Sequence, residues 1–246
     1  MDHTSIWNFL DDSDLSQYSL ILPSVAVGNV GQLACDLLIS SLNMKKIASV
    51  YSSAVIPVLG YDPYNLHSTS ISNSCEIYKC EIRNIVVLQL RAPLVYKSAR
   101  KFLEEVVRKF KEKSIKDFII LTSSFAHENK HISTSPFRYV SSDSCSHKKK
   151  MLDLNWIEHK CVDTLKIYGG GFASLLYEVC QENYIPCFIL YKYCSEGDNI
   201  PDAYDMISQL SSIVTLFSEK SDLLSQMVQP VSWKLLFGRP PPRDIY

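Results

Sequence analysis

The sequence LILPSVAVGNVGQLACDLLISSL, residues 20–42, changes its hydrophobic period part of the way along. Residues 20–27 are almost all apolar and include β-branched side chains, which predicts a buried strand. After the tight turn 28–31, apolar residues recur at the spacing of one helix face. Asn29 stands where it can cap that helix, and Gln32 stands where it can return the hydrogen bond of a capping box. The stretch therefore predicts a strand, a turn and a helix in direct succession.

The composition is that of an ordinary globular chain. Of the 246 residues, 46% are apolar and 21% are charged, and the formal net charge is −1. This charge gives no general electrostatic reason to expect nucleic acid or a membrane surface as partner. No apolar run approaches the roughly 18 residues that a membrane span needs. The eight cysteines and an acidic start without signal-peptide features favour reduced thiols inside the cell, so we expect the cytoplasm and the nucleus.

The rest of the chain alternates between strand and helix patterns. Strands are predicted at 46–51, 75–82, 85–90, 117–122 and 186–193, and helices at 97–113, 172–183 and 204–217. The residues between 82 and 85 predict the turn of a β-hairpin. This alternation predicts an α/β fold, a three-layer α/β/α sandwich around a mostly parallel or mixed sheet.

The domain organisation follows from the same patterns. We expect residues 1–18 to form an N-terminal arm and residues 19–238 to form a single α/β domain. Residues 123–150 are rich in serine and lysine and make an excursion too long for a simple connection. Residues 239–246 form a proline-rich C-terminal tail.

Candidate chemistry in the chain is sparse. Two glycine turns, 28–31 and 169–171, precede predicted helices, where backbone N–H groups can hold phosphate. Neither turn matches a dinucleotide fingerprint or a P-loop, so tight turning is the favoured role. The pairs of cysteine and histidine have single-residue spacing, which is not the usual zinc pattern. We therefore predict no catalytic residue, no metal site and no cofactor.

Two aromatic groups are candidates for a partner-binding surface. One group is Phe137, Arg138 and Tyr139, and the other is Trp233, Leu236 and Phe237. Aromatic side chains beside arginine are typical anchors of protein interfaces, although packing onto the domain is an equally open alternative. Three consecutive prolines then stiffen a tail that presents Ile245, Tyr246 and a carboxylate away from the body, which suits insertion into a pocket.

Several longer motifs resemble the proteasome assembly chaperone family. These are LPSVAVGNVGQLACDLLISSLNM (22–44), VLQLRAP (87–93), STSPFRY (133–139), GGG (169–171), SEGDNIPDA (195–203) and SWKLLFG (232–238). They extend over nearly the whole chain. The residues that we assign a structural role as family-motif positions are Gly28, Asn29, Gly31, Gly169, Gly170, Gly171, Glu196, Gly197, Asp198 and Asn199.

The resemblance implies a function without catalysis. Members of the family have an α/β/α sandwich related to nucleoside phosphorylase-like domains. The resemblance implies a heterodimer with proteasome assembly chaperone 1 that binds proteasome α subunits, promotes α-ring formation and prevents off-pathway α-ring dimers. In related chaperones a C-terminal hydrophobic–tyrosine–any motif inserts between α subunits, whereas Tyr246 is the last residue here. Two alternatives stay open, a nucleoside phosphorylase-like enzyme and a small-ligand-binding module at residues 28–31.

Overall fold

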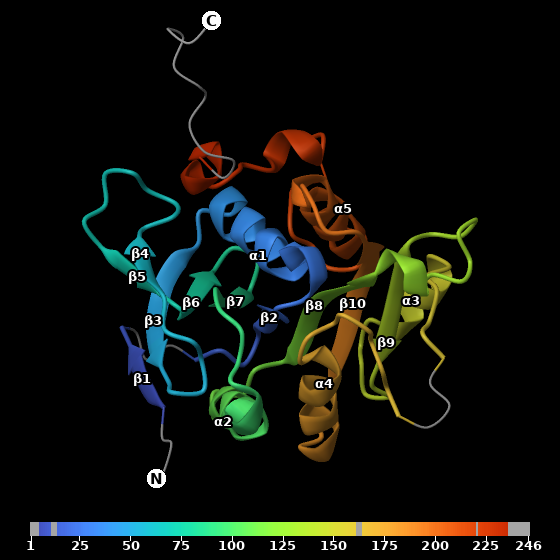
Figure 1. The fold of residues 1–246 in the computed structure, drawn as a ribbon, viewed down its shortest axis with the longest axis horizontal. Helices are drawn as coiled ribbons and strands as arrows, with labels where there is room; N and C mark the ends of the chain where they lie inside the picture. The colour runs from blue at the N-terminus through green and yellow to red at the C-terminus, as the bar shows by residue number, and fades with distance from the viewer. Residues whose placement is uncertain (1–4, 11–13, 161–163, 220, 236–246) are drawn as a thin grey trace, which may run out of the picture.

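The computed structural model describes residues 5–10, 14–160, 164–219 and 221–235. Its centre is a mixed sheet of eight strands with helices on both faces (Figure 1). This arrangement confirms the predicted α/β/α sandwich with a mixed sheet. Within the described residues, no helix is both long and apolar enough to cross a membrane.

The sheet is parallel in the middle and antiparallel at its edges. Its spatial order is β1-β3-β6-β7-β2-β8-β10-β9, and β7, β2, β8 and β10 are parallel. The bounds are β1 Ile6–Phe9, β2 Ser19–Pro23, β3 Lys45–Tyr51, β6 Cys75–Cys80, β7 Ile85–Leu90, β8 Asp117–Phe125, β9 Phe137–Ser141 and β10 Cys187–Cys194. A separate two-stranded ribbon consists of β4 Leu59–Tyr61 and β5 Ile71–Asn73.

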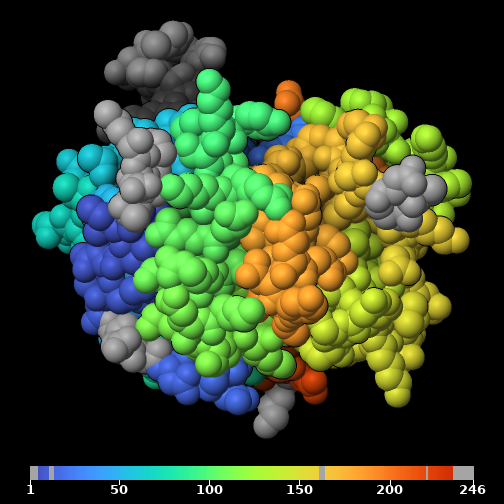
Figure 2. Space-filling model, turned by 90° about the horizontal axis from the view of Figure 1, so that it is seen from below, coloured from blue at the N-terminus to red at the C-terminus, as the bar shows by residue number. Residues whose placement is uncertain are grey.

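The helices form the two outer layers. On one face lie α1 (Val30–Ser41) and α5 (Ile200–Ser211), and on the other lie α2 (Tyr96–Glu112) and α4 (Ala173–Glu182). Figure 2 shows α2 and α4 side by side on the lower face, where Arg100 contacts Glu178 at 3.2 Å and Glu182 at 2.5 Å. The short α3 (Lys148–Asp153) follows β9, and 3₁₀ turns span Val27–Asn29, Ala126–Glu128, Leu224–Gln226 and Val231–Leu235.

The core is divided by the sheet into two apolar clusters. In β8, Phe118 and Ile120 face the cluster under α2 and α4, while Ile119 and Leu121 face the cluster under α1 and α5. Successive side chains of a strand point to opposite faces, so a continuous apolar strand can feed both layers. This explains why the central strands have no polar face in the sequence.

The predicted strand–turn–helix unit is present, but its turn is built differently. The strand ends at Pro23, and Asn29 has a left-handed backbone with φ 52° and no side-chain cap on α1. The Gln32 side chain donates to the Leu90 carbonyl oxygen at 2.9 Å. The predicted capping box is therefore wrong, because a contact with a neighbouring strand takes the side chain that was to complete it.

Other segments also differ from the sequence-based expectation. Within the predicted arm, β1 pairs with β3 and forms one edge of the sheet. Within the predicted polar excursion, β8 continues to Phe125 and β9 pairs antiparallel with β10. The predicted helix 204–217 is α5, which begins at Ile200 and ends at Ser211. Pairing with a neighbouring strand sets the strand bounds, and the Asp198 carboxylate, which accepts from the Ile200 amide, sets the start of α5.

Candidate functional site: glycine turns, a buried polar cluster and an exposed ribbon

The glycine motifs, far apart in the sequence, meet at the carboxyl ends of β2 and β8. The Ser24 hydroxyl donates to the Gly170 carbonyl oxygen at 2.8 Å and accepts from the Phe172 amide at 2.8 Å. The Val27 amide donates to the Gly169 carbonyl oxygen at 2.9 Å. The structure thus joins the turn after β2 to the turn before α4 by backbone and hydroxyl groups.

These turns leave no room for side chains at the glycines. A Cβ on Gly171, which has φ +62°, would lie 2.1 Å from the Val25 carbonyl oxygen. A Cβ on Gly28, which has φ +65°, would lie 2.7 Å from the Asn199 side chain. A Cβ on Gly31 would lie 2.4 Å from the Leu121 carbonyl oxygen. The space beside residues 28–31 is filled by protein atoms, which supports the packing role of the turn over phosphate binding.

The SEGDN motif provides the third part of this junction. The Asp198 carboxylate accepts from the Ile200 amide at 3.1 Å, which fixes the first turn of α5. The Asn199 amide donates to the Ser195 carbonyl oxygen and to the Asp202 carboxylate, both at 2.9 Å. Gly197 has φ +150°, in a region that favours glycine, and Glu196 is exposed. The motif holds α5 and places Asn199 against Gly28.

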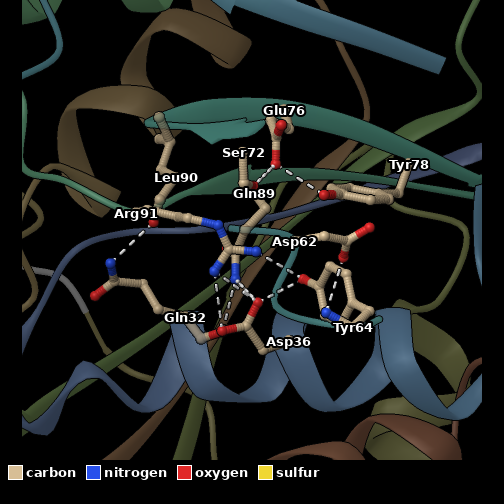
Figure 3. Close-up of polar contacts among 10 residues, drawn as sticks. All are labelled: Gln32, Asp36, Asp62, Tyr64, Ser72, Glu76, Tyr78, Gln89, Leu90 and Arg91. Atoms are coloured by element: carbon tan, nitrogen blue, oxygen red, sulfur yellow. Dashed lines mark hydrogen bonds and ion pairs between the residues drawn. The ribbon is translucent and has the colours of Figure 1, made fainter. Parts of the chain in front are cut away.

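A buried polar cluster, which sequence patterns did not reveal, lies between α1 and the sheet. Figure 3 shows Asp36 of α1 facing Arg91, Tyr64 and Gln89. The Asp36 carboxylate lies 3.0 Å from the Arg91 guanidinium and accepts hydrogen bonds from the Tyr64 hydroxyl at 2.6 Å and the Gln89 amide at 2.7 Å. Arg91 also donates to the Tyr64 hydroxyl at 2.9 Å. Because burial and then the Asp36 charge raise the pKa of Tyr64, the phenol stays protonated and keeps donating.

A second buried carboxylate extends the cluster along the sheet. Glu76 of β6 is 1% exposed, forms an ion pair with Lys46 and accepts a hydrogen bond from Ser72. The Tyr78 hydroxyl donates to the same carboxylate at 2.8 Å. Since Ser72 belongs to β5, this carboxylate connects the two-stranded ribbon to the main sheet.

The polar cluster holds the segment that carries the ribbon β4–β5. Tyr64 lies in the loop between the two ribbon strands, and its ring packs edge-on against Tyr78 with centroids 5.5 Å apart. At the base of the ribbon, the Ser74 hydroxyl accepts from the Val58 amide at 2.6 Å and donates to the Ile56 carbonyl oxygen at 2.7 Å. The ribbon is thus fixed at its base and at its connecting loop, and it stands beside β3 at the sheet's margin (Figure 1).

The ribbon presents apolar side chains to solvent. Leu59 is 73% exposed and Tyr61 87% exposed, and Ile71 lies opposite Tyr61 in the strand register. A groove of about 360 Å³ beside β4 is lined by Ile6, Tyr51 and Val58, among others. We define the ribbon surface as Ile6, Tyr51, Val58, Leu59, Tyr61 and Ile71. Residues 51–74 contain a single charged residue, Asp62, and this depletion is the sequence signal that could have revealed the surface.

Of the residues predicted as a partner-binding surface, those that the structure describes are buried or half-buried. Tyr139 is fully buried, Arg138 is 7% exposed, and Phe137 is half-buried at the start of β9. Trp233 is 7% exposed and packs in the cluster under α1 and α5. For these side chains the structure shows the packing that was the open alternative. Leu236, Phe237, Ile245 and Tyr246 lie outside the described residues.

Comparison with known proteins gives consistent matches. A sequence model of the PAC2 family matches residues 20–229. The chain is 35% identical to human proteasome assembly chaperone 2 over 246 residues, covering 92% of this chain and 93% of the human protein. It is 24% identical to the Saccharomyces cerevisiae protein of the same name over 261 residues, covering 92% of this chain and 96% of the yeast protein.

Solved structures from an archaeon share the fold. PbaA of Pyrococcus furiosus, an archaeal homolog of proteasome-assembly chaperone, matches with a TM-score of 0.68 at 18% identity, covering 91% of each chain. PbaB of the same organism, an archaeal proteasome activator, matches with a TM-score of 0.67 at 14% identity, covering 92% of this chain and 93% of PbaB. At these identities the likeness shows a common fold.

Proposed function

We propose, since this chain belongs to the PAC2 family, that it is a proteasome assembly chaperone that works by binding proteins and without catalysis. The observation that carries the proposal beyond the family is the ribbon surface. It is an apolar, almost uncharged area held rigidly on a buried polar cluster. Charge-depleted areas with aromatic side chains are typical of the buried centre of protein interfaces.

We also propose that the chain forms a heterodimer with proteasome assembly chaperone 1. The pair would bind proteasome α subunits, promote α-ring formation and prevent off-pathway α-ring dimers. We assign the ribbon surface to the partner chaperone and not to the α subunits. A permanent interface is more apolar than a transient one, and a chaperone must release the α ring while keeping its partner.

The second contact in this proposal is the C-terminal tail. Ile245 and Tyr246 would dock on the α ring, with the Tyr246 side chain entering a pocket between α subunits. The support is the order of residues in the sequence, where three prolines separate this end from the domain.

Co-purification tests the assignment of the ribbon surface. The double variant Leu59→Ser with Tyr61→Ser should weaken binding of proteasome assembly chaperone 1 by at least roughly tenfold, about 1.4 kcal/mol. The matched control is Ile82→Ser, which changes an 87% exposed side chain in the turn between β6 and β7. Equal binding by both variants would remove the ribbon surface from the interface. No binding of the partner by the unaltered chain would refute the heterodimer.

A truncation tests the tail separately. Deletion of residues 244–246 should weaken capture of α subunits and leave heterodimer formation intact. Unchanged capture would show that the tail is not used.

An assay for phosphorolysis of nucleosides by the purified chain tests the enzymatic alternative, and turnover above a buffer control would contradict the proposal of a purely binding role.

We also propose that the protein is located in the cytoplasm and the nucleus. Fluorescence microscopy of the tagged full chain tests it, and exclusion from both compartments would contradict it.

A further inference from the structure

A cavity of about 550 Å³ lies at the end of β8 and β10, away from the ribbon surface. Ser124 and Tyr193 from the ends of these two strands line it, together with segments 128–134, 157–160 and 166–168. Its volume falls in the range of roughly 300–1,000 Å³ that is usual for small-molecule sites. In open α/β sheets, ligands bind outside the carboxyl ends of the parallel strands.

A buried cation that pairs with no carboxylate of the described residues forms part of the wall. Arg138 is 7% exposed. Its guanidinium donates to the Phe137 carbonyl oxygen at 2.7 Å and to the Thr134 hydroxyl at 3.0 Å. It also donates to the Ser135 carbonyl oxygen and to the Asn129 amide oxygen at 3.4 Å. All these partners are neutral, and no carboxylate in the described part of the chain pairs with Arg138. Because a buried charge is normally compensated, this positive charge favours an anion nearby.

Three further cations line the same cavity. Lys130, Lys160 and Lys166 are exposed, and none of them forms an ion pair within the described residues. Against these four cations, the described residues of the lining include two carboxylates, Glu128 and Glu158. Since the whole chain has a formal net charge of −1, the positive excess is a local property of this cavity.

The cavity also offers neutral donors and aromatic faces. The Nδ1 atom of His159 lies 2.6 Å from the Tyr191 hydroxyl. Burial, followed by the charge of Arg138, lowers the pKa of His159 and keeps the ring neutral at pH 7. A neutral ring that accepts the Tyr191 proton at Nδ1 carries its own proton on Nε2, where it is a donor. Tyr168 is 56% exposed and adds an accessible ring to the lining.

We propose that this cavity binds a small phosphate-bearing molecule. Its phosphate groups would lie among Arg138 and the three lysines, and the rest of the molecule would lie against Tyr168 and Tyr193. A phosphate group concentrates up to two negative charges on one centre, whereas a ligand carboxylate carries only one. Because the lining itself contains two carboxylates that repel an anion, the more highly charged phosphate group suits it better. The site is separate from the ribbon surface and does not depend on the proposed chaperone role.

Calorimetric titration of the full chain with inorganic pyrophosphate and with ADP tests the proposal, at constant ionic strength. We expect saturable binding of one equivalent, weakened at least tenfold in the double variant Lys160→Glu with Lys166→Glu. The matched control is Lys97→Glu with Lys101→Glu, which makes the same charge change on exposed lysines of α2 and should bind as the unaltered chain does. These exposed positions are chosen because Arg138 holds its loop together and its replacement endangers folding.

The imidazole signals of His159 in NMR spectra locate the ligand. They should shift on addition of pyrophosphate and stay unchanged with an equal ionic strength of chloride. Several results would overturn the proposal. One is an absence of binding of either probe at a concentration of about 10 mM, at which even a site with millimolar affinity would be occupied. The others are an equal loss of binding affinity in the control variant, and tighter binding of a polyglutamate peptide than of pyrophosphate. Tighter binding of ADP than of pyrophosphate would support contacts of the aromatic rings with the rest of the ligand.

Discussion

The glycine turns and the ribbon surface differ in how much room surrounds their glycines. At the turns, backbone atoms approach so closely that a single added carbon on Gly171 would lie 2.1 Å from a carbonyl oxygen. On the ribbon, a carbon added to Gly60 would meet no atom within 4 Å. The turns are closed by the chain itself and serve the fold. The ribbon keeps apolar side chains in solvent, although its anchor is buried, and it is the surface to which we assign the partner chaperone.

The largest expected effect comes from filling the glycine position in the turn before α4, compared with the open glycine position on the ribbon. Gly171→Ala should lower the free energy of unfolding by about 3 kcal/mol or more, because the alanine combines a left-handed backbone with overpacking. Gly60→Ala should change it by less than about 0.5 kcal/mol. Urea denaturation of the isolated chain measures both. Similar midpoints for the two variants would show that the turn is not the tightly packed region described above.

The next effect concerns the polar cluster beneath the ribbon. Arg91→Leu leaves Asp36 without its cation and should cost about 2 kcal/mol, less than for a fully buried pair because Arg91 and Asp36 are 19% and 13% exposed. Arg108→Leu removes an exposed pair with Glu112 on α2 and should cost less than about 0.5 kcal/mol. Equal losses would mean that the cluster does not stabilise the fold more than a surface pair does.

A smaller and more local effect is expected from one hydroxyl group. Tyr64→Phe removes the hydrogen bonds to Asp36 and Arg91 and should cost about 1 kcal/mol. Hydrogen exchange should become faster in residues 58–74, while exchange in β8 should change only as far as global stability does. Tyr61→Phe, on the exposed face of the ribbon, is the control and should leave exchange unaltered. Uniform acceleration across the sheet would show that the ribbon is not a separate unit.

The smallest effect on stability is expected at the ribbon surface itself. Leu59→Ser with Tyr61→Ser should shift the free energy of unfolding of the isolated chain by less than about 0.5 kcal/mol, since both side chains are largely exposed. The same variant should show the loss of partner binding described above. A large loss of stability would place these side chains in the fold and would make them unsuitable as evidence for an interface.

Much of the fold was predictable because its signals are local. The helix period of residues 97–113 and the apolar strands at 85–90 and 117–122 correspond to α2, β7 and β8 within a few residues. The hairpin of β6 and β7 is also confirmed. Strands in the predicted arm and excursion were not recognised, because β1 and β9 are short edge strands whose formation depends on pairing with β3 and β10.

The candidate site was predictable in its motif residues, which are the glycine turns and residues 196–199, but not in the contacts between them. The sequence identified the turns at 28–31 and 169–171, but it did not show that they face each other and Asn199. It assigned Tyr139 and Trp233 to a possible surface, and the structure places both in the core, where their size fills space under the helices. It did not identify the cluster of Asp36, Tyr64 and Arg91, since these residues come from three separate segments.

By itself, the sequence determined the alternation of strands and helices, the family and the positions where only glycine suits the turns. Hydrophobic period and backbone conformation are properties of neighbouring residues, so they can be read along the chain. The tertiary structure alone decided which polar side chains are paired, which aromatic residues are buried and where an apolar ribbon remains in solvent. These depend on contacts between residues such as Asp36 and Arg91, 55 positions apart, which only folding brings together.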